Sequence, residues 1–308
     1  MLITVTSLST AQAQGALGKL ELGPAYTDLL AGRLRLRAPA AARVEARGHS
    51  IMAAKASDQH ETRVMLDAGK ERLVLMALEL FESEGPDLEA AVRKEGAAMP
   101  KPPQIEALKL GDLRAVALIP TTHDLKREAI LLLMVYVVSP DKLVQQLSFY
   151  VNPTGGGDIQ GVTALSRRIA GTITAGSTQL SLKGGPRALS DGLSLSLPDG
   201  FVATVQNGPD FTVHHLRKIV PFGQRSPRIG IYIGGHPSYQ HRQADDIPAE
   251  VKKSPGKILG TGVEWQTWVR GKAPDQVTMM EAITPVPASH GPHALKLHVF
   301  MSSASATD

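Results

Sequence analysis

The sequence contains no cysteine, and this absence excludes three kinds of site at once. A disulfide, a cysteine-ligated zinc ion and a thiolate nucleophile all require that side chain. Small secreted domains commonly rely on disulfides for stability, so each domain of this chain must be held together by its own hydrophobic core.

Aromatic residues make up only 4% of the chain, and the excess of positive charge is small. Platforms that stack sugars or single-stranded nucleic acids need exposed rings, which this composition does not favour. Lys and Arg exceed Asp and Glu by 33 to 29, without the clustered basic stripe of a nucleic-acid binder. We therefore expect no nucleic-acid partner.

No apolar run approaches the roughly 20 residues of a membrane-spanning helix, so no membrane span is expected. The first fourteen residues read MLITVTSLSTAQAQ. Ala11-Gln12-Ala13 has the small-x-small form of a signal-peptidase site, although a basic segment before the apolar stretch is missing. We expect residues 1–16 to be a tail or a signal-peptide remnant and the protein to be periplasmic or secreted, with a cytoplasmic location as the alternative.

The 308 residues suit two domains of about 150 residues each, and an internal repeat supports this division. Residues 32–39 read GRLRLRAP and residues 191–198 read DGLSLSLP. Both alternate apolar and polar residues, as a half-buried strand does. Both end in Pro, which lacks the amide donor that a strand needs.

The similarity extends to the flanking segments. Residues 19–24 resemble 179–186, and both predict a short strand before a Gly-Pro turn. The apolar strand predicted at 72–80 corresponds to that at 228–234, and each precedes a predicted helix, at 83–94 and 245–253. Three more strands follow in each copy, at 106–118, 129–138 and 143–151 in the first and at 258–270, 276–284 and 294–301 in the second.

Two features separate the copies from an exact repeat. Residues 129–138 are apolar at both parities, so this strand should be covered on both faces. Residues 158–174 predict a closing helix capped by Asp158, with one apolar face formed by Ile159, Val162, Leu165, Ile169 and Ile173. The second copy has no such helix, and residues 302–308 are expected to be a disordered tail.

The predicted fold class is therefore α+β, with two related modules, each an antiparallel sheet with helices packed on it. The first module is assigned to residues 17–176 and the second to residues 177–301. The order of strands and helices, with the (D/G)-φ-x-φ-x-φ-P opening at 32–39 and 191–198, where φ is apolar, resembles the PsbP-like and DcrB-like fold. The resemblance implies a non-enzymatic adaptor, assembly factor, secretion chaperone or lipoprotein, and it implies no catalytic residue.

Seven of the ten histidines lie in the second copy. His236, His241, His290, His293 and His298 could meet in space around a metal ion. The alternation of His298 with Lys296 instead favours a solvated face, so ordinary surface histidines are the preferred interpretation. The Gly-rich loop at 152–158 lacks both the P-loop lysine and the third glycine of a dinucleotide motif, so a flexible turn is preferred and no cofactor is expected.

Two groups of residues are candidates for partner binding. Arg33, Arg35 and Arg37 alternate along one predicted strand and could bind an anionic partner, although a solvated sheet face explains them as well. Leu295, Leu297 and Val299 lie on a sheet face that lacks a covering helix, so the first module, a second subunit or a partner protein should cover them.

No nucleophile elbow or zinc-protease motif is present, and isolated carboxylates such as Glu79, Asp112 and Glu264 have no partner recognisable from spacing. The sequence thus favours a non-catalytic binding or adaptor protein, such as a chaperone, an immunity-type inhibitor or an assembly factor, with a protein as partner. A hydrolase or metal-dependent enzyme that uses the second-module histidines and a structural envelope component remain the alternatives.

Overall fold

The computed structural model describes residues 17–48, 59–69, 71–124, 127–152, 158–242, 248, 250–271, 276–286 and 294–303. The chain forms two compact units. The first comprises Met1–Arg47, His60–Leu80 and Glu84–Gln179, and the second comprises Gly48–Gln59, Phe81–Ser83 and Leu180–Asp308. We call these units the first and the second module. Residues 1–16, 153–157 and 304–308, which carry three of the sequence-based expectations, lie outside the described residues.

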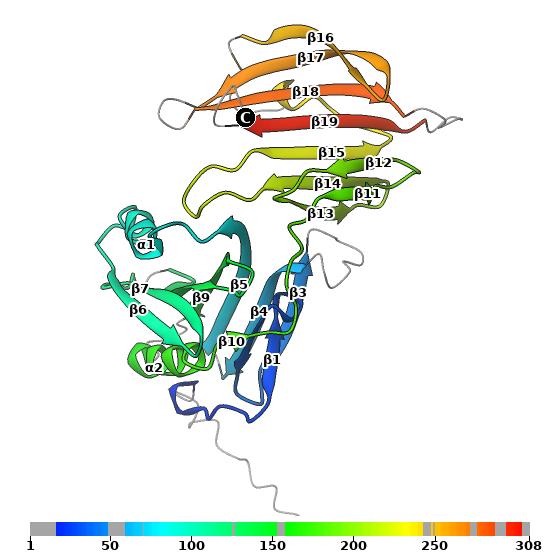
Figure 1. Ribbon diagram of the computed structural model, residues 1–308. Coiled ribbons are helices and arrows are strands. Elements are labelled where there is room, and N and C mark those ends of the chain that lie inside the picture. The colour runs from blue at the N-terminus through cyan, green and yellow to red at the C-terminus, as the bar shows by residue number, and fades with distance from the viewer. Residues whose placement is uncertain are drawn as a thin grey trace, which may run out of the picture. The chain divides into compact units, whose positions relative to one another are not determined.

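The first module is built on a seven-stranded sheet with the strand order β3-β4-β5-β9-β8-β7-β6 (Figure 1). Its strands are β3 (Arg43–Gly48), β4 (Gln59–Ala68), β5 (Glu71–Ser83), β6 (Gln104–Leu110), β7 (Leu113–Ile119), β8 (Ile130–Val138) and β9 (Leu143–Asn152). A small sheet, in the order β1-β2-β10, joins β1 (Tyr26–Leu29) and β2 (Leu34–Arg37) to the short β10 (Thr174–Ala175).

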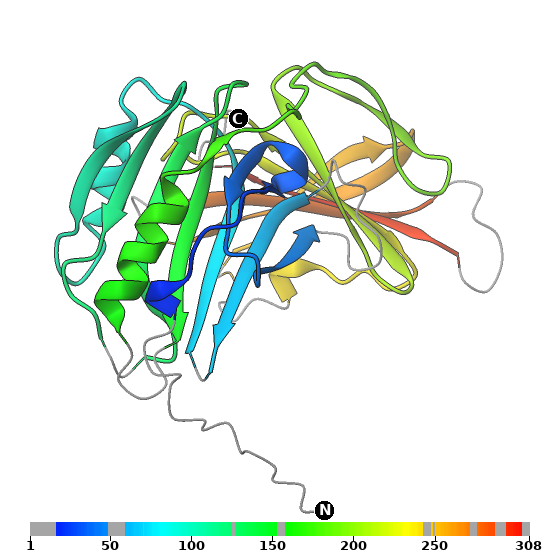
Figure 2. The same cartoon turned by 90° about the horizontal axis from the view of Figure 1, so that it is seen from below.

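Helix α2 (Ile159–Ala170) follows β9 and packs against β8 and β9 (green in Figure 2). The Asp158 carboxylate accepts a hydrogen bond from the Gly161 amide at 2.8 Å, so the predicted cap is confirmed. The helix ends at Ala170, before the predicted end at 174, and Thr174 begins β10. The buried side of α2 joins one hydrophobic core with β7, β8 and β9. This core includes Val162, Leu165, Ile169, Ala115, Ala117, Val135, Val137 and Leu147.

The other face of the first sheet carries helix α1 (Leu88–Gly96), which connects β5 to β6. Ala117 belongs to the α2 core, and its neighbour Leu118 points to the opposite side, where its side chain lies next to Gly96 of α1. Strand β8 is therefore covered on both faces. Seven of its nine residues are buried, as its continuous apolar sequence predicts.

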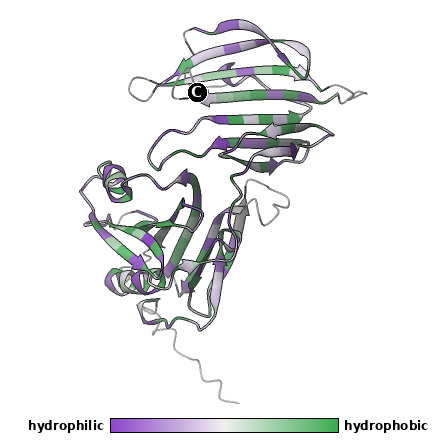
Figure 3. Cartoon of the chain, viewed as in Figure 1, coloured by the Kyte–Doolittle hydropathy of each residue, from purple (hydrophilic) through white to green (hydrophobic). Residues whose placement is uncertain are grey.

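The second module contains a seven-stranded sheet with the order β13-β14-β15-β19-β18-β17-β16. Its strands are β13 (Phe201–Asn207), β14 (Phe211–Lys218), β15 (Arg228–Gly234), β16 (Lys252–Ile258), β17 (Thr261–Arg270), β18 (Val277–Pro285) and β19 (Lys296–Ser303). Hydrophobic and hydrophilic residues are interspersed along these strands (Figure 3). A two-stranded sheet of β11 (Gly185–Ala188) and β12 (Ser194–Leu197) precedes them.

The two large sheets have the same topology. Counted from one edge, each sheet contains its first three strands in chain order, then its last strand, and then its remaining three strands in reverse chain order. In each module a small hairpin, β1–β2 or β11–β12, comes first. The segments 32–39 and 191–198 supply β2 and β12, the second strands of those hairpins. The modules differ in their helices, since α1 and α2 both belong to the first and the described part of the second contains only the short 3-10 helix η5 (Gln240–Arg242).

Several predicted boundaries are wrong. The predicted strand at 19–24 is wrong, because no strand is formed there: the 3-10 helix η2 (Leu17–Lys19) ends at its first residue and β1 starts only at Tyr26. The single strands predicted at 106–118 and 258–270 are each split by a two-residue turn, at 111–112 and 259–260. Positive φ angles at Gly111, Leu259 and Gly260 reverse the chain there, and an apolar/polar alternation does not reveal this.

The two helices predicted at 83–94 and 245–253 also need correction. Helix α1 begins at Leu88 and is capped by Asp87, whose carboxylate accepts a hydrogen bond from the Ala90 amide, rather than by Ser83. In the second module the described end of the segment 245–253 is extended, because Lys252 and Lys253 begin β16. Residues 302 and 303, assigned to the tail, pair as part of β19. Strands β3, β4, β13 and β14 were not predicted.

Candidate protein-binding surface and buried polar clusters

Arg33 does not lie on the exposed arginine row that the sequence predicts. Its φ and ψ are −78° and −34°, so it precedes the extended strand and does not follow the alternation of β2. Its side chain is 1% exposed, and Nε donates to Glu79 Oε2 at 3.0 Å. Gln145 Nε2 donates to the same oxygen at 3.0 Å. This buried ion pair links the hairpin to β5 and β9, so Arg33 is a structural residue.

The turn that carries Arg33 into the core has unusual backbone geometry. Leu30 and Ala31 have φ of 51° and 56°, and Gly32 follows at 82°. Such angles cost energy for residues with a Cβ and persist where the surroundings hold them. Here the Leu30 amide donates to Thr62 Oγ1 at 2.9 Å, which ties the turn to β4.

Arg35 and Arg37 are exposed, as predicted. Their guanidinium carbons lie 5.4 and 4.8 Å from the centre of the Tyr26 ring on the paired strand β1. Arg35 Nε also lies 3.1 Å from Asp28 Oδ1. The row is thus a two-residue cation–π arrangement whose role in partner binding stays a prediction.

Leu297 is covered by residues of its own module, which contradicts the expectation that its whole face is open. It is 4% exposed and forms a small core with Ile233 and Val286. Leu189 and Leu193, from the turn between β11 and β12, pack on this core. Leu295 and Val299 are partly buried at its border.

Farther along the same face the apolar residues are only partly covered. Paired residues of an antiparallel sheet share a face, so Met301 lies beside Met280 and Val299 beside Ala282. Thr267 pairs with Met280, which places Trp265 and Val269 on this face as well. Val269 is 47% exposed. We call the surface formed by Trp265, Val269, Met280, Val299 and Met301 the open face.

The open face corresponds to the surface that α2 covers in the first module. Counted from the two-residue turns, Ala117 of β7 corresponds to Trp265 of β17. Ala117 is 1% exposed beneath α2, whereas Trp265 is partly exposed. A Cβ on Gly256 would clash with the Trp265 ring, so the ring lies against the backbone of β16. The large side chain thus covers some of the surface that a helix covers in the first module.

The opposite face of the second sheet contains a buried carboxylate, Glu281, which is 0% exposed. Its Oε1 accepts from Nδ1 and the amide of His241, at 2.7 and 3.1 Å. Its Oε2 accepts from His298 Nε2 at 2.7 Å and from the Gln240 amide at 2.8 Å. These four contacts fix η5 on the sheet.

Burial of the Glu281 carboxylate by itself would raise its pKa. The hydrogen bonds from His298, the Gln240 amide and His241 outweigh burial and lower the pKa of Glu281 to about 2. The carboxylate is therefore ionised in the folded protein. His241 and Trp268 rings lie 5.6 Å apart, which packs this cluster further.

His298 is 4% exposed, so the expected solvated position is wrong. Lys296 on the same strand is exposed because it lies at the end of β19, beyond the Glu281 cluster. Glu281 lies 17 residues from His298 and 40 from His241, and no local spacing connects them. The three side chains come together because β18 pairs with β19 and because η5 packs on this face of the sheet.

An imidazole held by a buried carboxylate can act as a general base. His241 and His298 are 9% and 4% exposed, so a substrate could reach neither ring without rearrangement. Within the described parts of the chain, no group of three or more His, Asp or Glu side chains is placed to hold a metal ion. His290 and His293 lie outside the described residues.

His214 and His215 point to opposite faces of β14, as their adjacency predicts. His214 is buried, and its Nε2 accepts a long hydrogen bond of 3.4 Å from the Ser190 amide. Burial lowers the pKa of His214, because the charged ring would be desolvated there.

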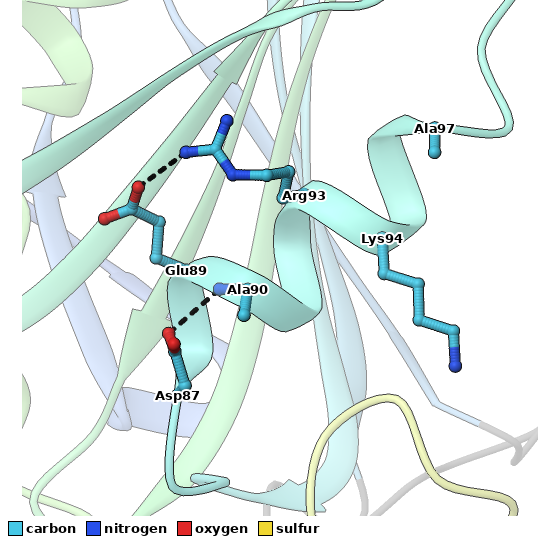
Figure 4. A pocket seen from close by; sticks show the side chains of 6 residues that line it. All are labelled: Asp87, Glu89, Ala90, Arg93, Lys94 and Ala97. Carbon is cyan, nitrogen blue, oxygen red and sulfur yellow. Dashed lines mark hydrogen bonds and ion pairs between the residues drawn. The ribbon is translucent and has the colours of Figure 1, made fainter.

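A shallow hollow runs along the outer side of α1 (Figure 4). It is lined by Asp87, Glu89, Ala90, Arg93, Lys94 and Ala97. Glu89 and Arg93 form an ion pair at 2.7 Å, and Asp87 caps the helix. Asp87, Glu89 and Arg93 thus find partners within α1 itself, and Lys94 is exposed. No helix among the described residues is long and apolar enough to cross a membrane.

Comparisons with known proteins identify no family. No family model and no curated protein matches the chain. The immunity protein TplEi of T6SS from Pseudomonas aeruginosa, solved with the "L" peptide, is 10% identical, with 90% of this chain and 86% of that chain covered and a TM-score of 0.20. MucB in complex with MucA(peri) is 10% identical, with coverage of 87% and 82% and a TM-score of 0.16. Likeness at these TM-scores carries no argument about function, and the PsbP-like and DcrB-like resemblance stays an expectation.

Proposed function

We propose that this chain is a non-catalytic adaptor that binds a protein partner through the open face of its second module. The two modules are proposed to be copies of one unit, and within the described residues no helix covers the face of the second that α2 covers in the first. The observation that carries this proposal is the contrast between the two sheets. The face beneath α2 is buried, whereas its counterpart around Trp265 and Val269 is partly exposed.

The composition of the open face suits protein binding. Tryptophan is enriched among residues that dominate binding energy. Two methionines, Met280 and Met301, lie side by side, and their flexible side chains adapt to different partner surfaces. Partly exposed apolar side chains gathered on one face of a folded protein support an interaction site.

Site-specific photo-crosslinking in the native host tests the proposal. A photoreactive residue replaces Val269, and the matched control replaces Val44 of β3, which is exposed to nearly the same extent, 46% against 47%. We expect one defined protein to crosslink at position 269 and not at 44, and the yield to fall when Met301→Glu is added. The purified partner should then bind the unmodified chain directly. Equal capture at both positions, or none at 269, would contradict the proposal.

The proposed export rests on the pattern in residues 1–14. Mass spectrometry of the N-terminus of the protein made in its native host checks it. Cleavage after Ala13 is the expected result, and an uncleaved chain in the cytoplasmic fraction would favour the alternative.

A further inference from the structure

The covered face of the first module shows how a helix recognises this kind of sheet. The apolar side of α2 lies on β8 and β9 and reaches Ala115 and Ala117 of β7 within one core. At its edge, Arg167 of α2 pairs with Glu106 of β6, with Nη1 and Oε2 3.2 Å apart. The packing of α2 on its sheet thus combines an apolar stripe of the helix with an ion pair to the edge strand β6.

The second module offers the same arrangement with a different charge. Ser254 of β16 corresponds to Glu106 of β6. Each lies at the same number of residues before the turn of its hairpin, and each pairs with one of the two corresponding residues, Ser254 with Trp265 and Glu106 with Ala117. Two residues away on the same face stands Lys252, where the first module has Gln104. Lys252 is exposed and has no ion pair among the described residues, whereas Lys253 on the other face pairs with Glu264 at 2.8 Å.

We infer that the open face binds an amphipathic helix of the partner protein, oriented like α2 and carrying acidic residues where α2 carries Arg167 and Arg168. This inference rests on the proposed function and adds the chemistry of the bound element. Met280, Val299 and Met301 receive the apolar stripe of that helix, and Lys252 pairs with its acidic edge. A helix laid into an apolar groove is a common mode of peptide recognition.

Peptides based on the sequence of α2 are the probes for the test. Three stapled peptides carry the α2 sequence of residues 159–170: the native basic sequence, an acidic version with both arginines replaced by Glu, and the acidic version with its central leucine replaced by Asp. The staple is needed because twelve residues form a marginal helix in water. Both tryptophans of the protein, Trp265 and Trp268, lie in the second module, so fluorescence titration of the full chain reports binding there alone.

We expect the acidic peptide to bind at least tenfold more tightly than the basic one and the Asp-containing peptide not to bind. Lys252→Glu should reverse the preference between the acidic and basic peptides. Val269→Glu should weaken binding at least tenfold, and Val44→Glu should leave it unchanged. Val269 is already exposed, so its substitution should not prevent folding.

Equal affinity of the acidic and basic peptides, or an unchanged preference in Lys252→Glu, would overturn the inference. A fluorescence change that depends on protein concentration without peptide would assign the face to a second copy of the chain and would overturn it as well. Specific crosslinking at position 269 combined with no peptide binding would leave the proposed function standing and remove only the helical, acidic character of the partner.

Discussion

Arg33 shows how a single residue can differ from the pattern around it. Three arginines at every second position predict one charged face, and two of them follow that prediction. The left-handed turn at Leu30 and Ala31 rotates the chain just before the strand, so Arg33 points inward to Glu79. Neither residue type favours positive φ, so nothing local in the sequence announces this turn.

Replacing Arg33 by Ala should destabilise the first module by about 3 kcal/mol, because the Glu79 carboxylate would remain buried without its counter-charge. The matched control is Arg35→Ala, which removes an exposed ion pair and should cost less than about 1 kcal/mol. Urea unfolding followed by far-ultraviolet circular dichroism measures both. Arg33→Met combined with Glu79→Leu should recover most of the loss. Equal effects of the two alanine variants would mean that the buried pair is not held as described.

At the scale of elements, the predictable ones are those whose signal is local. Helix α2 has a capping Asp158 and a 3.6-residue apolar period, and strand β8 is apolar throughout. The sequences of the hairpins β6–β7 and β16–β17 each predict a single strand, because a two-residue turn leaves the alternation almost intact. The Glu281 cluster depends on which strands become neighbours, and that information is not present in any one segment.

Strand β8 allows a direct test of the predicted core. Leu133 is 2% exposed and lies in the core that α2 closes. Leu133→Ala should lower the free energy of unfolding of the first module by about 2–5 kcal/mol, since the cavity cannot collapse between the helix and the neighbouring strands. The control is Met134→Ala on the same strand, whose partly exposed side chain should cost less. A denaturant midpoint that does not change in Leu133→Ala would place β8 at the surface.

For the whole molecule, the identical strand order of the two sheets is the feature that unites sequence and structure. The Leu-x-Leu repeats at 34–36 and 193–195 pointed to related positions, although they cover only the small hairpins. What the repeat could not show is how differently the two modules cover their sheets. The first buries one face under α2, and the second relies on the β11–β12 turn and on η5.

The second module should lose stability in acid in two steps. The pKa of His214 is lowered in the folded state. As the pH falls below the usual histidine pKa of 6.5, the unfolded chain therefore binds a proton more readily than the folded chain, and the folded state is destabilised. Glu281 has a folded pKa of about 2 against a usual 4.5, so its contribution is complete above 4.5 and is lost as the pH falls toward 2. That shift corresponds to about 3 kcal/mol.

Tryptophan fluorescence during urea unfolding, repeated between pH 8 and pH 3, measures this response in the second module alone, because Trp265 and Trp268 both lie there. The urea midpoint should be level above pH 7, begin to fall below pH 6.5 as the unfolded chain binds a proton at His214, and fall further below 4.5. His214→Gln should flatten the first step, while the same change at the exposed His236 should leave it intact. Glu281→Gln should flatten the second step and lower the midpoint at neutral pH, because the amide nitrogen that replaces one carboxylate oxygen cannot accept hydrogen bonds and the remaining oxygen carries no charge. A midpoint that stays constant down to pH 3 in the unmodified protein would contradict the lowered pKa of both buried groups and, with it, the Glu281 cluster as described.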